Sequence, residues 1–274
     1  MMYGEVIKQI RLNKNLPLKS VYFGICSKTN AVKFENGERM LAADKFAGVL
    51  ANLMLTMPEF SWIKNGYHPQ KADYYQYIVS QAWNAHQPMR LEKHLAQIEA
   101  SQVERAQLAS YRLLQQYDQK VAPDRTELAI IIGYFSNLAT WSISDAKFFA
   151  NNCYVLPYSL LLSLLQEALK VQKRYRYYPN SDQVFATILT NCSDRMVQAK
   201  DFSNLKSTLA RLDKMTTDIT MAGYCLLSRY YRAKVEFLYQ DHAAGEVQLI
   251  KIRGIAAFLK NQALLIEIDE LLKS

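Results

Sequence analysis

Apolar residues recur at helical spacing in short segments over the front quarter of the chain. Val6, Ile7 and Ile10 lie on one face of residues 4–13, with polar positions between them, and this pattern predicts an amphipathic helix. The same kind of pattern predicts four more short helices, over residues 18–25, 26–39, 43–55 and 57–63. We therefore expect residues 1–66 to form a five-helix domain.

The third of these segments carries start and stop signals for a helix. Ser27 is a typical N-cap residue, and Gly37 can adopt the left-handed backbone that often ends a helix. Between them, Ala31 and Phe34 are spaced to face a core. Gly24 allows a tight turn just before the segment. Two short helices joined by a glycine-containing turn predict a helix-turn-helix, whose second helix can enter the major groove of DNA.

The outward positions of this third helix carry side chains that can read base pairs. Asn30 can form two hydrogen bonds with adenine, Lys33 can reach guanine, and Thr29 offers a hydroxyl and a methyl group. Phosphate contacts would be expected of neighbouring polar and basic groups. The remaining candidates for DNA contact are Arg11, Lys14, Ser27, Lys28, Asn36 and Arg39. The alternative is an ordinary surface helix of a small helical bundle.

From residue 67 onward, one helical segment follows another, and several begin with Ser or Asp as a cap. The longest amphipathic stretch covers residues 89–117. A weak internal repeat is also visible, because Asn-Cys pairs end at Cys153 and Cys192, 39 residues apart. Such a period suits one helical hairpin per repeat. We therefore expect residues 67–274 to form a helical-hairpin repeat array, and the whole chain to be all-α.

Asn152 and Asn191 would take corresponding places in successive hairpins. An asparagine amide both donates and accepts hydrogen bonds, so the two could hold an extended peptide on the concave face that stacked hairpins form. The alternative is that the two amides bond neighbouring helices inside the core.

Composition agrees with helices and suggests a partner. Nine glycines and seven prolines among 274 residues are few for a turn-rich β protein. The formal net charge of +8 favours an acidic partner, with nucleic acid first, although a basic protein of another kind would carry the same charge.

The spacing of the cysteines and the length of the apolar runs indicate in which compartment the protein is found. Cys26, Cys153, Cys192 and Cys225 are far apart in sequence and form no CxxC pair, which indicates neither a disulfide framework nor a zinc site. The N-terminus has no apolar signal-peptide core, and the longest apolar run, LAIIIGYF, is about a third of a membrane span. We expect a reduced, cytoplasmic protein without membrane contact.

Motifs of catalysis are missing from the sequence. The histidines His68, His86, His94 and His242 form no HExxH motif, and there is neither a GxSxG motif nor a glycine-rich phosphate loop. We therefore expect no enzyme, no metal and no cofactor.

Residues 4–39, GEVIKQIRLNKNLPLKSVYFGICSKTNAVKFENGER, resemble the phage-repressor-like helix-turn-helix of the Rgg family of bacterial transcription regulators. Members of that family typically read like LSKSQISRFERGES at the third helix. Asn30 stands where the family often has Gln, and Lys33 where it has Arg. The resemblance implies an ion pair between an Arg of the first helix, here Arg11, and the Glu near the end of the third, here Glu35.

Residues 134–170 are similar, more loosely, to the helical domain of the same family, in their spaced aromatics, the Trp, the Asn-Cys pair and the Leu-rich helix that follows. The resemblance implies a domain that dimerises and that, in many members, binds a short hydrophobic signalling peptide on its concave face. It also places Asn152 and Asn191 where the family contacts the peptide backbone.

These observations predict a two-domain regulator that binds double-stranded promoter DNA with two half-sites, as a homodimer, under the control of a short peptide. RNA polymerase is a further candidate partner. Two alternatives stay open: a helical-repeat adaptor whose front domain docks a protein, and a regulator that senses a metabolite or redox state.

Overall fold

The structure, a computed structural model, describes residues 2–85, 87–98 and 103–273, and over these residues the chain contains helices and turns but no strand. Contacts between residues divide it into two compact units, Met1–Tyr77 and Ile78–Ser274, called here the front unit and the repeat unit. The division falls inside helix α6 (Lys71–Asn84), whereas residue 66 lies in the turn after α5. The all-α class is confirmed.

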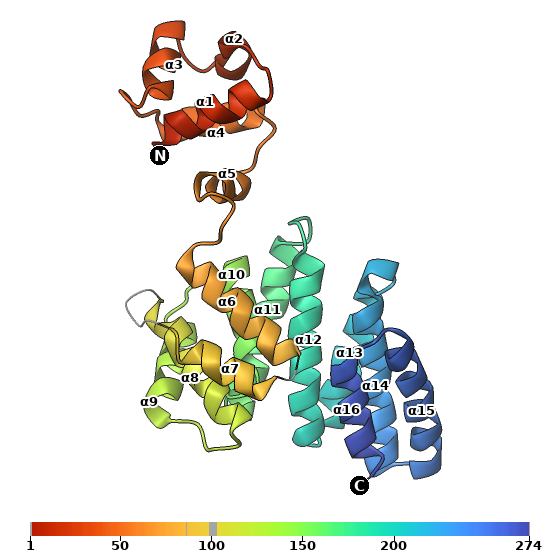
Figure 1. Ribbon diagram of the computed structural model, residues 1–274. Coiled ribbons are helices and arrows are strands. Elements are labelled where there is room, and N and C mark those ends of the chain that lie inside the picture. Colours follow the sequence, from red (N-terminus) through yellow and green to blue (C-terminus); the bar gives the residue numbers. More distant parts are fainter. Residues whose placement is uncertain (1, 86, 99–102, 274) are drawn as a thin grey trace. The chain divides into compact units, whose positions relative to one another are not determined.

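The front unit contains the five predicted helices (Figure 1). They are α1 (Tyr3–Asn13), α2 (Leu18–Tyr22), α3 (Lys28–Glu35), α4 (Ala43–Asn52) and α5 (Met57–Lys64). Helix α2 ends earlier than the expected residue 25, because Phe23 leaves the helical conformation and Gly24 has a φ of +73°. The expected tight turn at Gly24 is therefore present.

One aromatic cluster holds these helices together. The rings of Phe34 and Phe46 meet edge to face at 6.2 Å between centroids, and those of Phe46 and Phe60 at 5.0 Å. These rings come from α3, α4 and α5, and Val6 and Ile7 of α1 are buried in the same core. Edge-to-face pairs add stability beyond the apolar area that they bury. The inner side of α3 is thus held by all the neighbouring helices of the front unit.

The rest of the chain continues as α-helices of 8 to 18 residues and one short 3-10 helix. They are α7 (Pro88–Leu95), α8 (Arg105–Asp118), α9 (Arg125–Ser136), α10 (Ile143–Asn152), α11 (Tyr158–Arg174), α12 (Ser181–Gln198), α13 (Phe202–Met215), the short 3-10 helix η2 (Ile219–Met221), α14 (Ala222–Tyr239), α15 (His242–Phe258) and α16 (Gln262–Leu271). The amphipathic stretch 89–117 is divided between α7 and α8, and its residues 99–102 lie outside the described residues.

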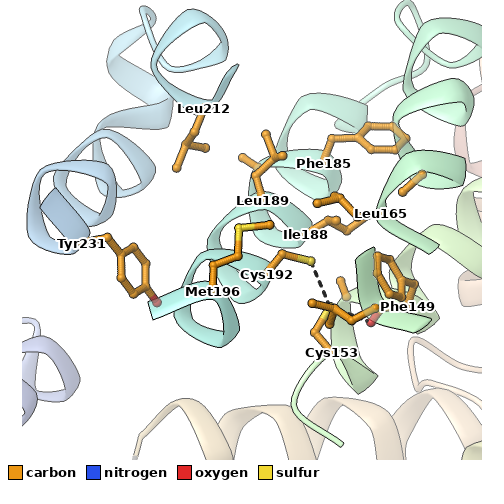
Figure 2. Close-up of a cluster of buried hydrophobic side chains, with 14 of the residues drawn as sticks. Phe149, Cys153, Leu165, Phe185, Ile188, Leu189, Cys192, Met196, Leu212 and Tyr231 are labelled. Atoms are coloured by element: carbon orange, nitrogen blue, oxygen red, sulfur yellow. Dashed lines mark hydrogen bonds between the residues drawn. The ribbon is translucent and has the colours of Figure 1, made fainter. Parts of the chain in front are cut away.

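Consecutive helices of the repeat unit pack as hairpins, and the hairpins stack. Helix α8 packs on α9, α10 on α11, α12 on α13 and α14 on α15, while α10, α12 and α14 also contact one another in that order. This is the expected helical-hairpin array. Its shared core includes Phe149 of α10, Leu165 of α11 and Phe185 of α12, all buried (Figure 2).

The core also brings together two cysteines that lie 39 residues apart in sequence. Figure 2 shows the sulfur of Cys192 directed at Cys153, with 3.8 Å between the two Sγ atoms. Both cysteines are free and buried. Burial, followed by the neighbouring Cys192, raises the pKa of the Cys153 thiol well above its ordinary value, so the reactive thiolate is disfavoured.

The described residues contain neither a candidate metal site nor a single membrane-spanning helix. No three side chains among their His, Cys, Asp and Glu residues come close enough to hold a metal ion, and His86 lies outside these residues. No single helix in the same part of the chain is long and apolar enough to cross a membrane. The pair α4 and α5 meets those criteria only jointly, across a bend of 87°.

Replacing Gly4 by alanine should destabilise the front unit. A Cβ at this position would lie 1.7 Å from the carbonyl oxygen of Phe34 and would push α1 away from α3. We expect Gly4→Ala to lower the free energy of unfolding by about 2 kcal/mol or more, as overpacking does. Urea unfolding followed by circular dichroism measures the change.

The control is Gly133→Ala in α9, where an added Cβ meets nothing within 4 Å. It should stabilise the protein by about 0.5–1 kcal/mol, because glycine is a poorer helix former than alanine. Equal effects of the two substitutions would contradict the close packing of α1 on α3.

Candidate nucleic-acid interface and ligand surface

Helix α3 is built by local signals at both ends. The hydroxyl of Ser27 accepts a hydrogen bond from the backbone N–H of Asn30 at 3.4 Å, which caps the first turn. Gly37 follows the helix with a φ of +76°, a conformation that favours glycine. Gly24 closes the turn between α2 and α3 in the same way. The chain therefore has the helix-turn-helix geometry that the sequence predicts.

The two faces of α3 differ as expected. Ala31 and Phe34 are buried in the aromatic core, with exposed fractions of 0% and 1%. Lys28, Thr29 and Lys33 are exposed on the opposite side. Because the inner face is fully packed, the outer face can keep a fixed orientation when it meets a partner.

Polar contacts tie neighbouring side chains to the outer face of α3. The Oδ1 atom of Asn30 accepts a hydrogen bond from the Nη1 group of Arg39. Asn36 accepts a hydrogen bond from the ammonium of Lys8 at 3.1 Å and donates one to Glu38 at 3.1 Å. Lys8 thus joins the candidate surface. Its position outside the apolar stripe of α1 was the only sequence signal for it.

Lys14, one of the predicted DNA contacts, forms a hydrogen bond within the protein. The ammonium of Lys14 donates a hydrogen bond to the carbonyl of Leu53 at 2.7 Å, at the C-terminal end of α4. A cation at this end of a helix is favoured by the carbonyls that lack helical partners. Lys14 therefore has a structural role in this unit, and its contact with DNA stays a prediction.

Arg11 and Glu35 form a bidentate ion pair. Arg11 Nε donates to Glu35 Oε1 at 2.8 Å and Nη2 donates to Oε2 at 2.7 Å, while Nη1 reaches the carbonyl of Leu16 at 3.0 Å. The side chains are only 12% and 3% exposed. Hydrogen bonding to Glu35 raises the pKa of Arg11, and burial, followed by the nearby Glu35 charge, raises the pKa of Tyr22. The pair thus links α1 to the last turn of α3.

The structure places the two candidate peptide-binding asparagines among helices. Asn152 is completely buried, and its amide donates to the carbonyl of Phe148 at 2.8 Å. Asn191 is half-buried, and its amide donates from α12 to the carbonyl of Ala150 in α10 at 2.9 Å. The Asn191 bond joins neighbouring helices, as in the alternative, whereas the Asn152 bond lies within α10. A peptide could reach Asn152 only if α10 moved, and peptide contact by either residue stays a prediction.

Two hollows on the repeat unit could hold a ligand. One, of about 280 Å³, lies between α11, α12 and α13 and is lined by leucines together with Gln166, Asn204 and Arg211. The other, of about 500 Å³, lies along α8 and α9, and its polar lining includes Arg105 and Thr126. These residues were not candidates from the sequence, because each hollow draws its lining from more than one helix and no motif connects the residues.

Comparison with known proteins places the chain in a family. A sequence model of the C-terminal domain of the HTH-type transcriptional regulator Rgg matches residues 87–270, which is more than half of the chain. The chain belongs to the Rgg family of transcription regulators. The resemblance stated from the sequence is thereby confirmed, and the family match covers most of the repeat unit.

Solved structures share the fold of this Rgg-family protein over nearly the whole length. A candidate transcriptional regulator from Listeria monocytogenes EGD-e is 22% identical with a TM-score of 0.79, and the match covers 99% of this chain and 96% of that one. The SHP pheromone receptor Rgg2 of Streptococcus dysgalactiae is 15% identical with a TM-score of 0.73, over 98% and 97%. PrgX in complex with cCF10 is 18% identical with a TM-score of 0.66, over 99% and 98%.

Removing the charge of Glu35 should unfold the front unit more readily. Glu35→Gln leaves the Arg11 guanidinium buried without its counter-charge, so we expect a loss of about 3 kcal/mol in the free energy of unfolding. The double variant Arg11→Met with Glu35→Leu should recover most of that loss, because apolar side chains can fill the same space. Urea titration of the purified proteins provides both values.

An exposed ion pair serves as the control. Glu167 and Lys170 lie 2.6 Å apart in α11, with side chains 48% and 65% exposed. Glu167→Gln should cost no more than about 0.5 kcal/mol, because water screens such a pair. If Glu35→Gln cost as little, the Arg11–Glu35 pair would have no role in holding α3.

Proposed function

We propose that this Rgg-family protein is a sequence-specific DNA-binding regulator that acts as a homodimer and is controlled by a short hydrophobic peptide. The observation that carries the proposal is the outer face of α3. It is capped by Ser27, fixed from behind by a packed core, and exposes Thr29 and Lys33, with Asn30 beside them.

The arrangement suits base recognition at the start of α3. The Oδ1 atom of Asn30 has two lone pairs, so it can accept from Arg39 and from the amino group of adenine together. Lys33 lies one turn further along with its ammonium in solvent, where the acceptors of guanine can meet it. Lys28 and Asn36 lie at the two ends of the helix, where backbone phosphates flank a recognition helix.

Two copies would present two such helices. Operator half-sites related by two-fold symmetry, about one helical turn or a multiple apart, follow from that symmetry. The net charge of +8 would speed the approach to DNA. RNA polymerase would be a further partner at a promoter, and the cytoplasm the place of action.

Peptide control is supported by the relatives. Rgg2 is a pheromone receptor, PrgX has been solved in complex with cCF10, and another similar structure is that of a bacterial peptide pheromone/receptor complex. In this chain the hollow between α11 and α13 combines apolar walls with Arg211, a group that could pair with a peptide carboxylate. A peptide regulates only if it binds one arrangement of the dimer better than another.

The other candidate functions find less support. An enzyme is disfavoured because the family consists of transcription regulators. Redox sensing by Cys153 and Cys192 is disfavoured because burial raises the pKa of the Cys153 thiol. The helical-repeat adaptor is the alternative against which the next experiment tests the proposal.

Fluorescence anisotropy tests the proposal, with a duplex from beside the protein's own gene and a scrambled duplex of equal composition. Asn30→Ala and Lys33→Ala should each weaken binding to the specific duplex by about 1–3 kcal/mol, and much less on the scrambled one. Lys206→Ala in α13 is the control, since it removes one exposed charge outside the front unit. Wild-type protein that bound neither duplex at low salt would favour the adaptor.

A separate measurement addresses Lys28. If its ammonium contacts a phosphate, Lys28→Ala should reduce the slope of log K against log salt concentration by about one, because one fewer counterion is released. The reduction should be the same on both duplexes. A slope equal to that of the wild type would remove Lys28 from the phosphate contacts.

A further inference from the structure

The connection between α11 and α12 differs in charge from the other connections of the repeat array. Lys173 and Arg174 are the last residues of this kind in α11, and Arg176 follows in the loop of residues 175–180 (Figure 1). In each of the other connections between α9 and α16, the last two helical residues and the loop together hold at most one Lys or Arg. The geometry of a helical hairpin therefore does not require the three cations. Residues 173–178 are called here the basic loop.

Part of this charge has a local reason, and part has none. Lys173 and Arg174 lie in the last turn of α11, where the helix dipole favours a cation, and Arg174 donates a hydrogen bond to the hydroxyl of Thr140 at 2.6 Å. Arg176 lies beyond the helix. Within the described residues, no carboxylate forms an ion pair with Lys173 or Arg176. Both charges are exposed and available to a partner.

Aromatic contacts hold the basic loop in one arrangement. Tyr175 packs against the core of the repeat unit, and its ring meets that of Tyr178 edge to face at 5.7 Å between centroids. The guanidinium of Arg176 lies over the ring of Tyr177, 4.2 Å from its centroid. A guanidinium stacked in this way keeps the N–H groups of its edge free for an acceptor. A partner would therefore meet a cation that is already placed, which lowers the entropy cost of binding.

The neighbouring helix end adds to the positive surface. The side-chain amide of Gln172 contacts the sulfur of Met215 at 2.9 Å, so the end of α11 lies beside the end of α13, where Lys214 is exposed. Two exposed acids are close in sequence to these helix ends: Asp182 lies in the first turn of α12, and Asp218 is hydrogen-bonded within its own turn. The three cations of the basic loop together with Lys214 outnumber them.

The groups presented at this surface suit phosphate. Arginine forms two parallel hydrogen bonds with a phosphate, and lysine and tyrosine are also common donors to the oxygens of a nucleic-acid backbone. Tyr177 is 83% exposed and Tyr178 51%, so both rings reach solvent. A row of phosphates would meet several of these donors together. DNA is the polyanion that the proposed function brings to this protein.

We propose that the basic loop, with Lys214 beside it, is a second DNA-contact surface, which binds the phosphate backbone outside the half-sites without regard to base sequence. This inference rests on the proposed function and adds to it a contact made by the repeat unit.

Fluorescence anisotropy at several salt concentrations tests the proposal with two duplexes from beside the protein's own gene. The short duplex holds only the candidate half-sites, and the long one continues on each side by about two helical turns. For the full-length wild type, we expect a steeper slope of log K against log salt concentration on the long duplex. Lys173→Gln with Arg176→Gln should reduce that slope by about two, because two fewer counterions are released, and leave the short duplex unaffected.

Two further proteins serve as controls. Arg176→Lys keeps the charge and should keep the wild-type slope. Lys206→Gln with Lys251→Gln removes two exposed charges from α13 and α15 and should change the slope on neither duplex. Equal wild-type slopes on the two duplexes, a basic-loop double variant that keeps the wild-type slope, or a control that loses as much slope would each overturn the inference.

Scrambled DNA separates this inference from the proposed function. Because the basic loop contacts phosphates, its double variant should lose the same slope on a long scrambled duplex. That loss, in a protein that binds native and scrambled duplexes equally, would uphold the surface and reject the regulator. Specific DNA binding that is indifferent to the basic loop would uphold the regulator and reject the surface.

Anionic lipid is the other extended source of phosphate. Vesicles of phosphatidylserine and phosphatidylcholine, sedimented with the wild type and the double variant, should bind both equally. Vesicle binding that requires Lys173 and Arg176, with DNA binding unaffected by them, would assign the surface to a membrane and overturn the inference.

Discussion

A helical hairpin has two apolar sides and can bury only one of them by itself. The repeat unit meets this constraint by stacking, since α10, α12 and α14 each cover the hairpin beside them. Phe149, Leu165 and Phe185 therefore belong to one core although they come from three helices (Figure 2). Helix α15 packs on α14 and α16, and its residues Leu249, Ile252 and Ala256 are buried.

In the front unit, the short helix α3 must be held rigidly while one of its sides stays exposed. Helix α3 has eight residues, too few to be stable alone in water. Phe34 anchors its inner side in the aromatic cluster, and Glu35 binds Arg11 of α1. Burying this charge pair brings little net stability, but its two parallel hydrogen bonds fix the direction in which α3 points. The orientation of the exposed side chains of α3 is fixed with it.

Local signals in the sequence predicted the parts of the structure that local physics decides. The N-cap at Ser27, the turn at Gly24 and the five front helices could be predicted, because each depends on neighbouring residues. Tertiary contacts were harder to predict: the Arg11–Glu35 pair came only from the family resemblance, and the bond of Lys14 to the carbonyl of Leu53 was not expected. The burial of Asn152 was one of two open alternatives. The stretch 89–117 carries one apolar pattern, yet two helices share it.

The proposed homodimer gives a ligand a means of control that leaves α3 unchanged. Two recognition helices held together bind two half-sites with an effective concentration set by the dimer, so overall affinity can exceed that of one helix by about 10²–10⁴. Any ligand that binds one arrangement of the paired repeat units better than another changes that gain by its differential affinity. The hollow lined by Arg211 lies between α11, α12 and α13, and α12 and α13 both pack on α14 in the same stack of hairpins. Regulation would then act on the pairing of the copies and reach DNA through the number of helices bound at once.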